Sequence, residues 1–122
     1  MLLKQDYLQI RVMELAPDVC VSGQLFESDI GILARQGVRS IVNNRPDGEA
    51  PGQPASADLA TAAEEYGLGY LHYPVEPGSI GEREAGAFAK ACEGLERPLH
   101  VFSRSGARSM KLWELAESMG FL

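Results

Sequence analysis

Short runs of apolar and β-branched residues alternate along this sequence with segments whose apolar residues recur at helical spacing. The β-branched run 38–43, for instance, follows a helical pattern that starts near Glu27 and stops at Gly37. Such alternation favours a mainly parallel sheet with helices on both faces, joined by right-handed crossovers. The sequence therefore predicts an α/β fold with about four to five strands. The expected strands are residues 18–23, 38–43, 70–75 and 99–102, and the expected helices are residues 27–36, 59–66, 82–95 and 109–119.

The size and charge of the chain disfavour several classes of function. A chain of 122 residues, 45% of them hydrophobic, is the size of one domain, and we expect residues 1–122 to form a single domain. The formal net charge of −6 disfavours nucleic acid and membranes as partners. Cys20 and Cys92 lack metal-ligand spacing, so we expect buried reduced thiols, no metal and no cofactor. The N-terminal residues resemble neither a signal peptide nor a membrane span, and we expect a cytoplasmic protein.

The segment from Ser103 to Ser109 has the composition of an anion-binding loop. It joins the expected strand 99–102 to the last expected helix, so its backbone N–H groups and the helix N-terminus can converge on one anion. Arg108 supplies a fork of donors for two anion oxygens, and Gly106 allows the backbone angles of a tight ring. Ser109 can donate its hydroxyl to the atom at position 103. The residues expected to line the bound anion are Arg104, Ser105, Gly106 and Ala107.

Four segments of the chain, residues 21–25, 41–49, 72–75 and 103–109, together resemble the bacterial beta-lactamase-hydrolase-like, phosphatase-like domain family. The most specific of them is the Asn-Arg-Pro-Asp-Gly-Glu run combined with the Ser103 loop. The resemblance implies a fold like that of tyrosine and dual-specificity phosphatases, with a C-terminal extension that this chain lacks, so the chain is expected to be truncated. Domains of this family are sometimes fused to, or encoded beside, sulfur-metabolising metallo-hydrolase domains. The resemblance therefore suggests a partner enzyme in sulfur metabolism.

The chain departs from this family at position 103. The family pattern has the nucleophilic cysteine there, whereas this chain has Ser103. In such a loop the amide dipoles and an arginine lower a thiol pKa enough to give a thiolate at neutral pH, and a serine hydroxyl is too weak an acid for this. Activation by His100 or His72 is disfavoured, because neither has an evident orienting carboxylate. Ser103 is then either an engineered inactivating substitution or the mark of a natural anion-binding pseudoenzyme.

Two reactions stay open for a cysteine-bearing loop of this kind. The family resemblance favours phosphate-monoester hydrolysis, with a small anion or a phosphorylated molecule as the substrate. Four residues separate Ser103 from Arg108, however, which is one fewer than in protein tyrosine phosphatases and equals the loop length of rhodanese-type sulfurtransferases. A tighter loop suits thiosulfate or a persulfide sulfur better than a phosphate ester. Rhodanese-type sulfur transfer is therefore the alternative.

A phosphatase also needs an acid that protonates the leaving oxygen. Residues 73–78, where the related phosphatases carry an aspartate for this purpose, contain Glu76 but no aspartate. Glu76, or Asp47 from the Pro/Gly-rich surface loop that begins at Arg45, is the candidate acid, unless Glu76 is solvated and Asp47 only holds a turn. Arg45 is expected to contact the anion or substrate, unless it forms a salt bridge to Glu49. The candidate catalytic residues are thus Ser103, Arg108, Ser109 and Asp47, and the candidate substrate-binding residues are Arg45, Glu76 and residues 104–107.

Overall fold

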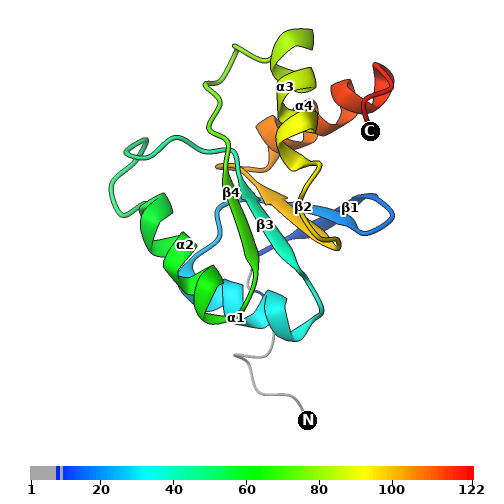
Figure 1. The fold of residues 1–122 in the computed structure, drawn as a ribbon. Coiled ribbons are helices and arrows are strands. Elements are labelled where there is room, and N and C mark those ends of the chain that lie inside the picture. The colour runs from blue at the N-terminus through cyan, green and yellow to red at the C-terminus, as the bar shows by residue number, and fades with distance from the viewer. Residues whose placement is uncertain (1–7, 9) are drawn as a thin grey trace.

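Five strands and four helices follow one another in residues 8 and 10–122, the part of the chain that the computed structural model describes. The strands are β1 (Val12–Ala16), β2 (Val19–Ser22), β3 (Ser40–Asn43), β4 (Gly69–His72) and β5 (Leu99–Phe102), and the helices are α1 (Glu27–Arg35), α2 (Ser56–Glu65), α3 (Glu82–Cys92) and α4 (Ala107–Ser118). The strands form one sheet in the order β1-β2-β5-β3-β4 (Figure 1). Only β1 is antiparallel to its neighbour. None of the described helices is long and apolar enough to cross a membrane.

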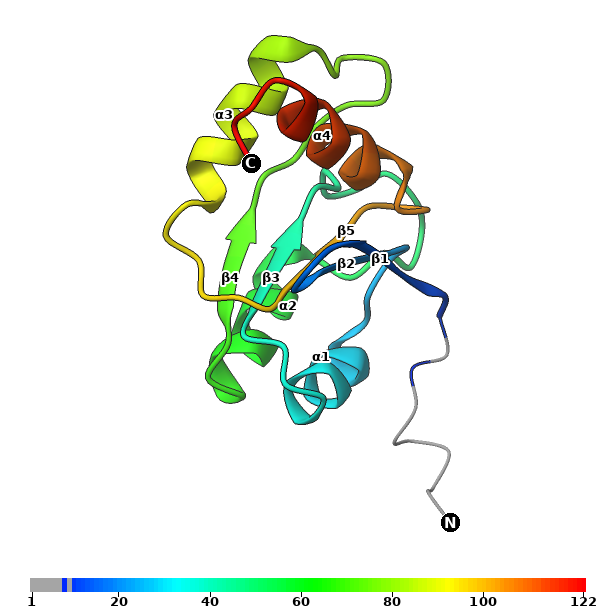
Figure 2. The same cartoon turned by 90° about the vertical axis from the view of Figure 1, so that its right-hand side faces the viewer.

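A pair of helices covers each face of the sheet, because successive residues of a strand point to opposite faces. In β3, Ile41 packs in the core beside α1 and α2, whereas Val42 packs in the core beside α3 and α4. β5 repeats the pattern in the opposite sense along the chain, with Val101 on the α3 and α4 side and Phe102 on the α1 and α2 side. Figure 2 shows the two helix pairs on opposite sides of the sheet. The predicted α/β class, with its mainly parallel sheet, is confirmed.

β1 is the strand without a sequence signal. Its sequence, Val-Met-Glu-Leu-Ala, does not alternate between apolar and polar residues. Its first three residues are exposed and its last two are half-buried. The strand forms because the turn at Pro17-Asp18 folds the chain back on itself, with Asp18 at a φ of 63°. Val12 is thereby paired with Ser22 of β2. Local hairpin geometry rather than burial of a regular apolar face makes this edge strand.

Two helices begin earlier than the sequence predicts. α2 begins at Ser56 rather than at Leu59, and its first N–H is satisfied from outside, since Asp47 accepts a hydrogen bond from the Ser56 N–H at 2.8 Å. α4 begins at Ala107 rather than at Ser109. The second half of the expected anion-binding loop is therefore already the first turn of a helix.

The carboxyl ends of β2, β5 and β3 meet at one edge of the sheet. Phe102, the last residue of β5, is in register both with Ser22 of β2 and with Asn43 of β3. The chain leaves this edge through Ser103 after β5 and through Asn44 after β3. Parallel α/β folds bind their ligands at such an edge. The fold thus brings the two most distinctive segments of the sequence, residues 44–49 and 103–109, to the same place.

His100 makes the stability of this fold depend on pH. It is 1% exposed, its Nε2 lies 2.7 Å from Ser22 Oγ, and burial lowers the pKa of the imidazole from 6.5 to about 4. The unfolded chain therefore binds a proton between about pH 6.5 and pH 4 that the folded chain does not. We expect the free energy of unfolding to fall by about 1–2 kcal/mol from pH 7 to pH 5 through this residue. Urea titrations at the two pH values should show a smaller difference in His100→Gln than in the parent.

Candidate anion-binding site

Ser103 lies inside the loop that joins β5 to α4. Its side chain is fully buried, and its Oγ accepts backbone hydrogen bonds from Gly106 at 3.1 Å and from Ser109 at 3.5 Å. Two N–H groups at the start of α4 thus point to the atom at position 103. A negative charge there, or an anion beside it, is stabilised both by these amides and by the positive end of the helix.

The loop holds this shape because the backbone at the end of β2 packs closely against its outer side. Gly106 has a φ of 95°, and a Cβ at this position would lie 3.0 Å from the carbonyl oxygen of Ser22. Gly23 is equally close, since a Cβ there would lie 3.0 Å from the carbonyl oxygen of Arg104. That carbonyl also accepts a hydrogen bond from the Gln24 N–H at 3.2 Å. Both glycines are needed because two backbone segments are in contact.

Arg108 is held by a carboxylate on one edge of its guanidinium. Its Nη1 and Nη2 donate to the two oxygens of Glu49 at 2.8 and 2.9 Å, and Nη1 also donates to the carbonyl oxygen of Val75 at 3.0 Å. Of the five guanidinium hydrogens, these contacts leave the Nε–H and one Nη2–H, which lie on the same side of the group. Among the described residues neither has a partner. One bidentate fork of Arg108 therefore stays available for an oxyanion.

Glu49 connects this arginine to a second one. Its Oε1 accepts a hydrogen bond from Arg45 Nε at 2.8 Å, while Arg45 Nη1 donates to Gln24 Oε1 at 3.0 Å. The hydrogen bond from Arg108 is the main cause that lowers the pKa of the Glu49 carboxyl to about 2, and Arg45 adds to it. Glu49 is therefore a fixed negative charge at neutral pH. Of the two readings of Arg45, the salt bridge to Glu49 is the one that the structure shows.

The hydroxyl of Ser109 does not take the role expected of it. It donates its single hydrogen to Asn44 Oδ1 at 2.7 Å, so it is the backbone N–H of Ser109, not the side chain, that reaches position 103. Asn44 is fully buried, and its Nδ2 donates to the carbonyl oxygen of Tyr73 at 2.9 Å. The Asn44 amide therefore fixes the start of α4 against the ends of β3 and β4.

Neither candidate acid is directed to the loop by a contact in the structure. Asp47 accepts the hydrogen bond from Ser56 at the start of α2, and Glu76 is exposed in a turn whose carbonyl oxygen accepts from Ser79. The histidines are likewise engaged elsewhere, since His100 pairs with Ser22 and His72 Nε2 lies 2.8 Å from the carbonyl oxygen of Arg45. Within the described residues, no hydrogen bond joins Ser103 to a general base.

The remaining loop residues contribute backbone rather than side chains. Arg104, Ser105 and Ala107 are exposed, and the Ser105 hydroxyl accepts the Ala107 N–H at 3.4 Å. Gly106 is buried. Among residues 10–122, no three His, Cys, Asp or Glu side chains gather as a metal site.

Residues 10–120 match the family described as "Beta-lactamase hydrolase-like protein, phosphatase-like domain". The chain belongs to this family. Beta-lactamase hydrolase-like proteins of Xylella fastidiosa (strain 9a5c) and Agrobacterium fabrum (strain C58) are 37% and 32% identical to it over 108 and 110 residues. These matches cover 88% and 90% of this chain but 25% and 26% of the relatives. This phosphatase-like domain thus spans about a quarter of the length of those proteins.

Solved structures share the fold of the phosphatase-like domain. A candidate phosphatase of Neisseria meningitidis is 28% identical, with a TM-score of 0.81 over 89% of this chain and 78% of that chain. A candidate phosphatase of Shewanella putrefaciens is 21% identical, with a TM-score of 0.76 over 92% of this chain and 74% of that one. A kinase-associated phosphatase with serine in place of its catalytic-site cysteine is 16% identical, with a TM-score of 0.61 over 90% of this chain and 75% of that one. The phosphatase-like fold that the sequence resemblance implied is confirmed.

Three residues of this phosphatase-like site are not among the sequence candidates: Glu49, Asn44 and Gln24. Glu49 and Asn44 belong to the Asn-Arg-Pro-Asp-Gly-Glu run, which marks the family but does not reveal which side chain meets which. Gln24 adjoins Gly23 at the end of β2. A carboxylate within four residues of Arg45 was the one available signal, and it pointed to a salt bridge rather than to Arg108. Contacts across 59 residues of sequence, such as Arg108 to Glu49, need the folded chain.

Replacing Gly106 by alanine tests the close packing between β2 and the loop. We expect Gly106→Ala to lose about 1–3 kcal/mol of stability, because the new Cβ combines a left-handed backbone with a close contact. Gly52→Ala is the matched control, since Gly52 has a φ of 78° with no atom within 4 Å of the added Cβ. Denaturant titrations should show the smaller loss in Gly52→Ala. Equal losses would mean that this packing contributes nothing.

Glu49→Gln tests the shared carboxylate. The folded pKa of about 2 lies below the ordinary value of 4.5, so the stabilisation is present at neutral pH and is lost as the pH falls through about 5 towards 2. We expect Glu49→Gln to lower the free energy of unfolding at pH 7 by on the order of 1–3 kcal/mol and to reduce its decline between pH 7 and about pH 4. Glu76→Gln, which removes an exposed carboxylate, should leave the free energy of unfolding at pH 7 unchanged.

Proposed function

We propose that the loop of this phosphatase-like domain binds the phosphate group of a phosphomonoester, and that hydrolysis requires cysteine at position 103. The observation that carries the proposal is the position of Ser103 Oγ, which accepts hydrogen bonds from two backbone amides at the N-terminus of α4. The open fork of Arg108 supports it, because a tetrahedral oxyanion needs bidentate donors beside such amides. With serine at this position, the domain binds its anion without turning it over.

The same amides explain why the identity of residue 103 decides between binding and catalysis. A thiol at this point gains from every donor that favours its charged form, so its pKa falls and a thiolate is present at neutral pH. A serine hydroxyl starts from a far higher pKa and has no base to accept its proton among the described neighbours. The amides of Gly106 and Ser109 then hydrogen-bond to the Ser103 hydroxyl without making it a nucleophile.

Sulfur transfer is the second candidate function. It is favoured because no candidate acid is directed to the loop. Asp47 is bonded to the start of α2, Glu76 is exposed, and Glu49, whose pKa is about 2, has no proton to give at neutral pH. A phosphate ester with a poor leaving group needs such a proton, whereas transfer of the outer sulfur of thiosulfate to a thiolate does not. If the domain transfers sulfur, we expect its partner to be an enzyme of sulfur metabolism.

Ser103→Cys separates the two reactions. We expect a reactive thiol with a pKa below that of free cysteine, together with slow hydrolysis of p-nitrophenyl phosphate, whose leaving group needs little protonation. The same preparation is assayed for transfer of sulfur from thiosulfate to cyanide. Hydrolysis without sulfur transfer supports the proposal, and sulfur transfer without hydrolysis replaces it with the second candidate.

Arg108 provides the control for the same assays. Ser103→Cys combined with Arg108→Ala should lose about a hundredfold or more in either activity, since the bidentate fork is gone. Arg104→Ala in the same background should have a smaller effect, because that side chain is exposed. Phosphate binding to the parent chain, followed by calorimetry, should fail in Arg108→Ala. Undiminished phosphate binding there would mean that the loop is not the site.

A further inference from the structure

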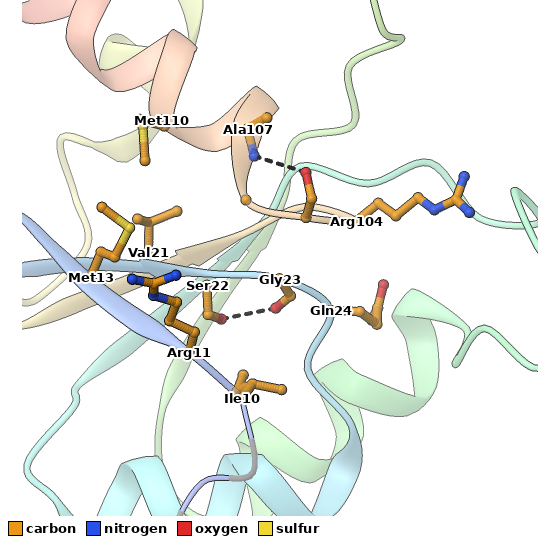
Figure 3. Close-up of a pocket in the computed structure, with 12 residues that line it drawn as sticks. Ile10, Arg11, Met13, Val21, Ser22, Gly23, Gln24, Arg104, Ala107 and Met110 are labelled. Atoms are coloured by element: carbon orange, nitrogen blue, oxygen red, sulfur yellow. Dashed lines mark hydrogen bonds between the residues drawn. The ribbon is translucent and has the colours of Figure 1, made fainter.

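A cavity of about 470 Å³ lies on the outer side of the Ser103 loop, between β1, the end of β2 and the first turns of α4 (Figure 3). Its walls are mainly apolar, formed by Ile10, Met13, Val21 and Met110. Backbone of residues 104–107 closes one side of it. We call the opposite side of this loop, where the amides of Gly106 and Ser109 meet Ser103 Oγ, the anion cradle. The cavity is therefore a separate site that shares one wall with the cradle.

The two hydroxyl groups that line this cavity, those of Ser22 and Ser105, already have partners. Ser22 Oγ donates to the carbonyl oxygen of Gly23 at 2.9 Å and lies 2.7 Å from His100 Nε2. The Ser105 hydroxyl accepts from Ala107. Neither hydroxyl therefore needs a hydrogen bond from an occupant, which lowers the cost of placing an apolar group beside them.

The shape of the walls favours a flexible chain over a rigid ring. Met13 and Met110 stand on two sides of the cavity, and Met13 is 48% exposed. Methionine side chains are unbranched and adapt to irregular apolar ligands. Among the described residues, none that lines the cavity is aromatic and could stack on a flat group. A volume of about 470 Å³ is within the usual range of small-molecule sites.

Arg11 lines this cavity and has no salt bridge to a carboxylate among the described residues. Figure 3 shows the guanidinium of Arg11 beside Met13, whereas Arg104 extends away from the cavity. Within the described part of the chain no acidic side chain forms a salt bridge with Arg11, although the chain as a whole has a net charge of −6. A planar guanidinium fork suits a carboxylate, which accepts two parallel hydrogen bonds.

From these features we infer that the cavity binds a medium-chain alkyl carboxylate. The alkyl chain lies between Met13, Val21 and Met110, and the carboxylate pairs with Arg11. Because the occupant would contact the backbone of residues 104–107, it also contacts the wall that forms the anion cradle. This site does not depend on which reaction, if any, the cradle supports.

Titration of the full chain with alkyl carboxylates tests this inference. With the methionine methyl groups labelled with carbon-13, octanoate should shift the Met13 and Met110 signals in a saturable manner. Affinity should rise roughly three- to fourfold per added methylene from butyrate to octanoate, as expected for burial of an alkyl chain. Octanol, which lacks the carboxylate, should bind more weakly than octanoate. Absence of saturation at millimolar octanoate, or affinity independent of chain length, would overturn the inference.

Two variants locate the ligand. Arg11→Gln should weaken octanoate binding roughly three- to tenfold, because one charge-assisted pair is lost. The matched control, Arg83→Gln, removes the same charge from the exposed face of α3 and should change nothing. Met13→Glu places a carboxylate at the mouth of the cavity and should abolish binding. Because Met13 and Arg11 are both exposed, neither variant removes core packing. An affinity unaffected by Arg11→Gln and Met13→Glu would rule out this cavity.

A membrane surface offers the same chemistry of alkyl chain and anionic head. Sedimentation with phosphatidylglycerol vesicles distinguishes this source from a free ligand. We expect the parent chain to stay in the supernatant while free octanoate binds. Co-sedimentation that is lost in Arg11→Gln, without saturable octanoate binding, would replace the small-molecule site with a lipid surface and overturn the inference.

Discussion

The hydrogen bonds from the amides of Gly106 and Ser109 to the atom at position 103 set the requirements for the rest of the site. Amides can converge on one point only if the chain turns sharply at the start of α4, and this turn needs the left-handed backbone of Gly106. The end of β2 packs against this turn, with the Ser22 carbonyl close to Gly106. A parallel pairing of β2 with β5 is what brings these two segments together. The loop is therefore a property of the sheet as much as of its own sequence.

Charge at the site is arranged so that one cationic edge remains available. Arg45 and Arg108 share the carboxylate of Glu49, which leaves one net positive charge beside the amides and the helix N-terminus. Without Glu49, two guanidinium groups would meet with no anion between them. The shared carboxylate both compensates this repulsion and fixes the plane of the Arg108 guanidinium, so that its open fork has a defined direction before any ligand arrives. The site thus carries local positive charge although the chain as a whole is acidic.

Serine at position 103 keeps this electrostatic arrangement, and in the proposed function it is the residue that prevents turnover. The backbone amides that would stabilise a thiolate remain in place. They donate hydrogen bonds to the Ser103 oxygen instead. The cavity on the outer side of the loop is lined by Ile10, Arg11 and Met13, by the end of β2 and by the start of α4, and it shares Gln24 and residues 104–107 with the anion site. Binding on either side of this backbone can therefore occur independently of the chemistry at residue 103.

By itself, the sequence determined the α/β class, all four parallel strands and the position of the Ser103 loop, because these depend on local periodicity and on residue spacing along the chain. The family was implied by the resemblance of four sequence segments. Strand β1 had no such signal, since a hairpin turn rather than a regular apolar face creates it. Tertiary structure alone decided the partners of the polar side chains. The Ser109 hydroxyl bonds to Asn44 rather than to position 103, Asp47 accepts the first N–H of α2, and Glu49 joins two arginines. The physical reason is that a hydrogen-bonding side chain takes whichever partner the packed sheet brings within about 3 Å, and sequence distance carries no information about that choice.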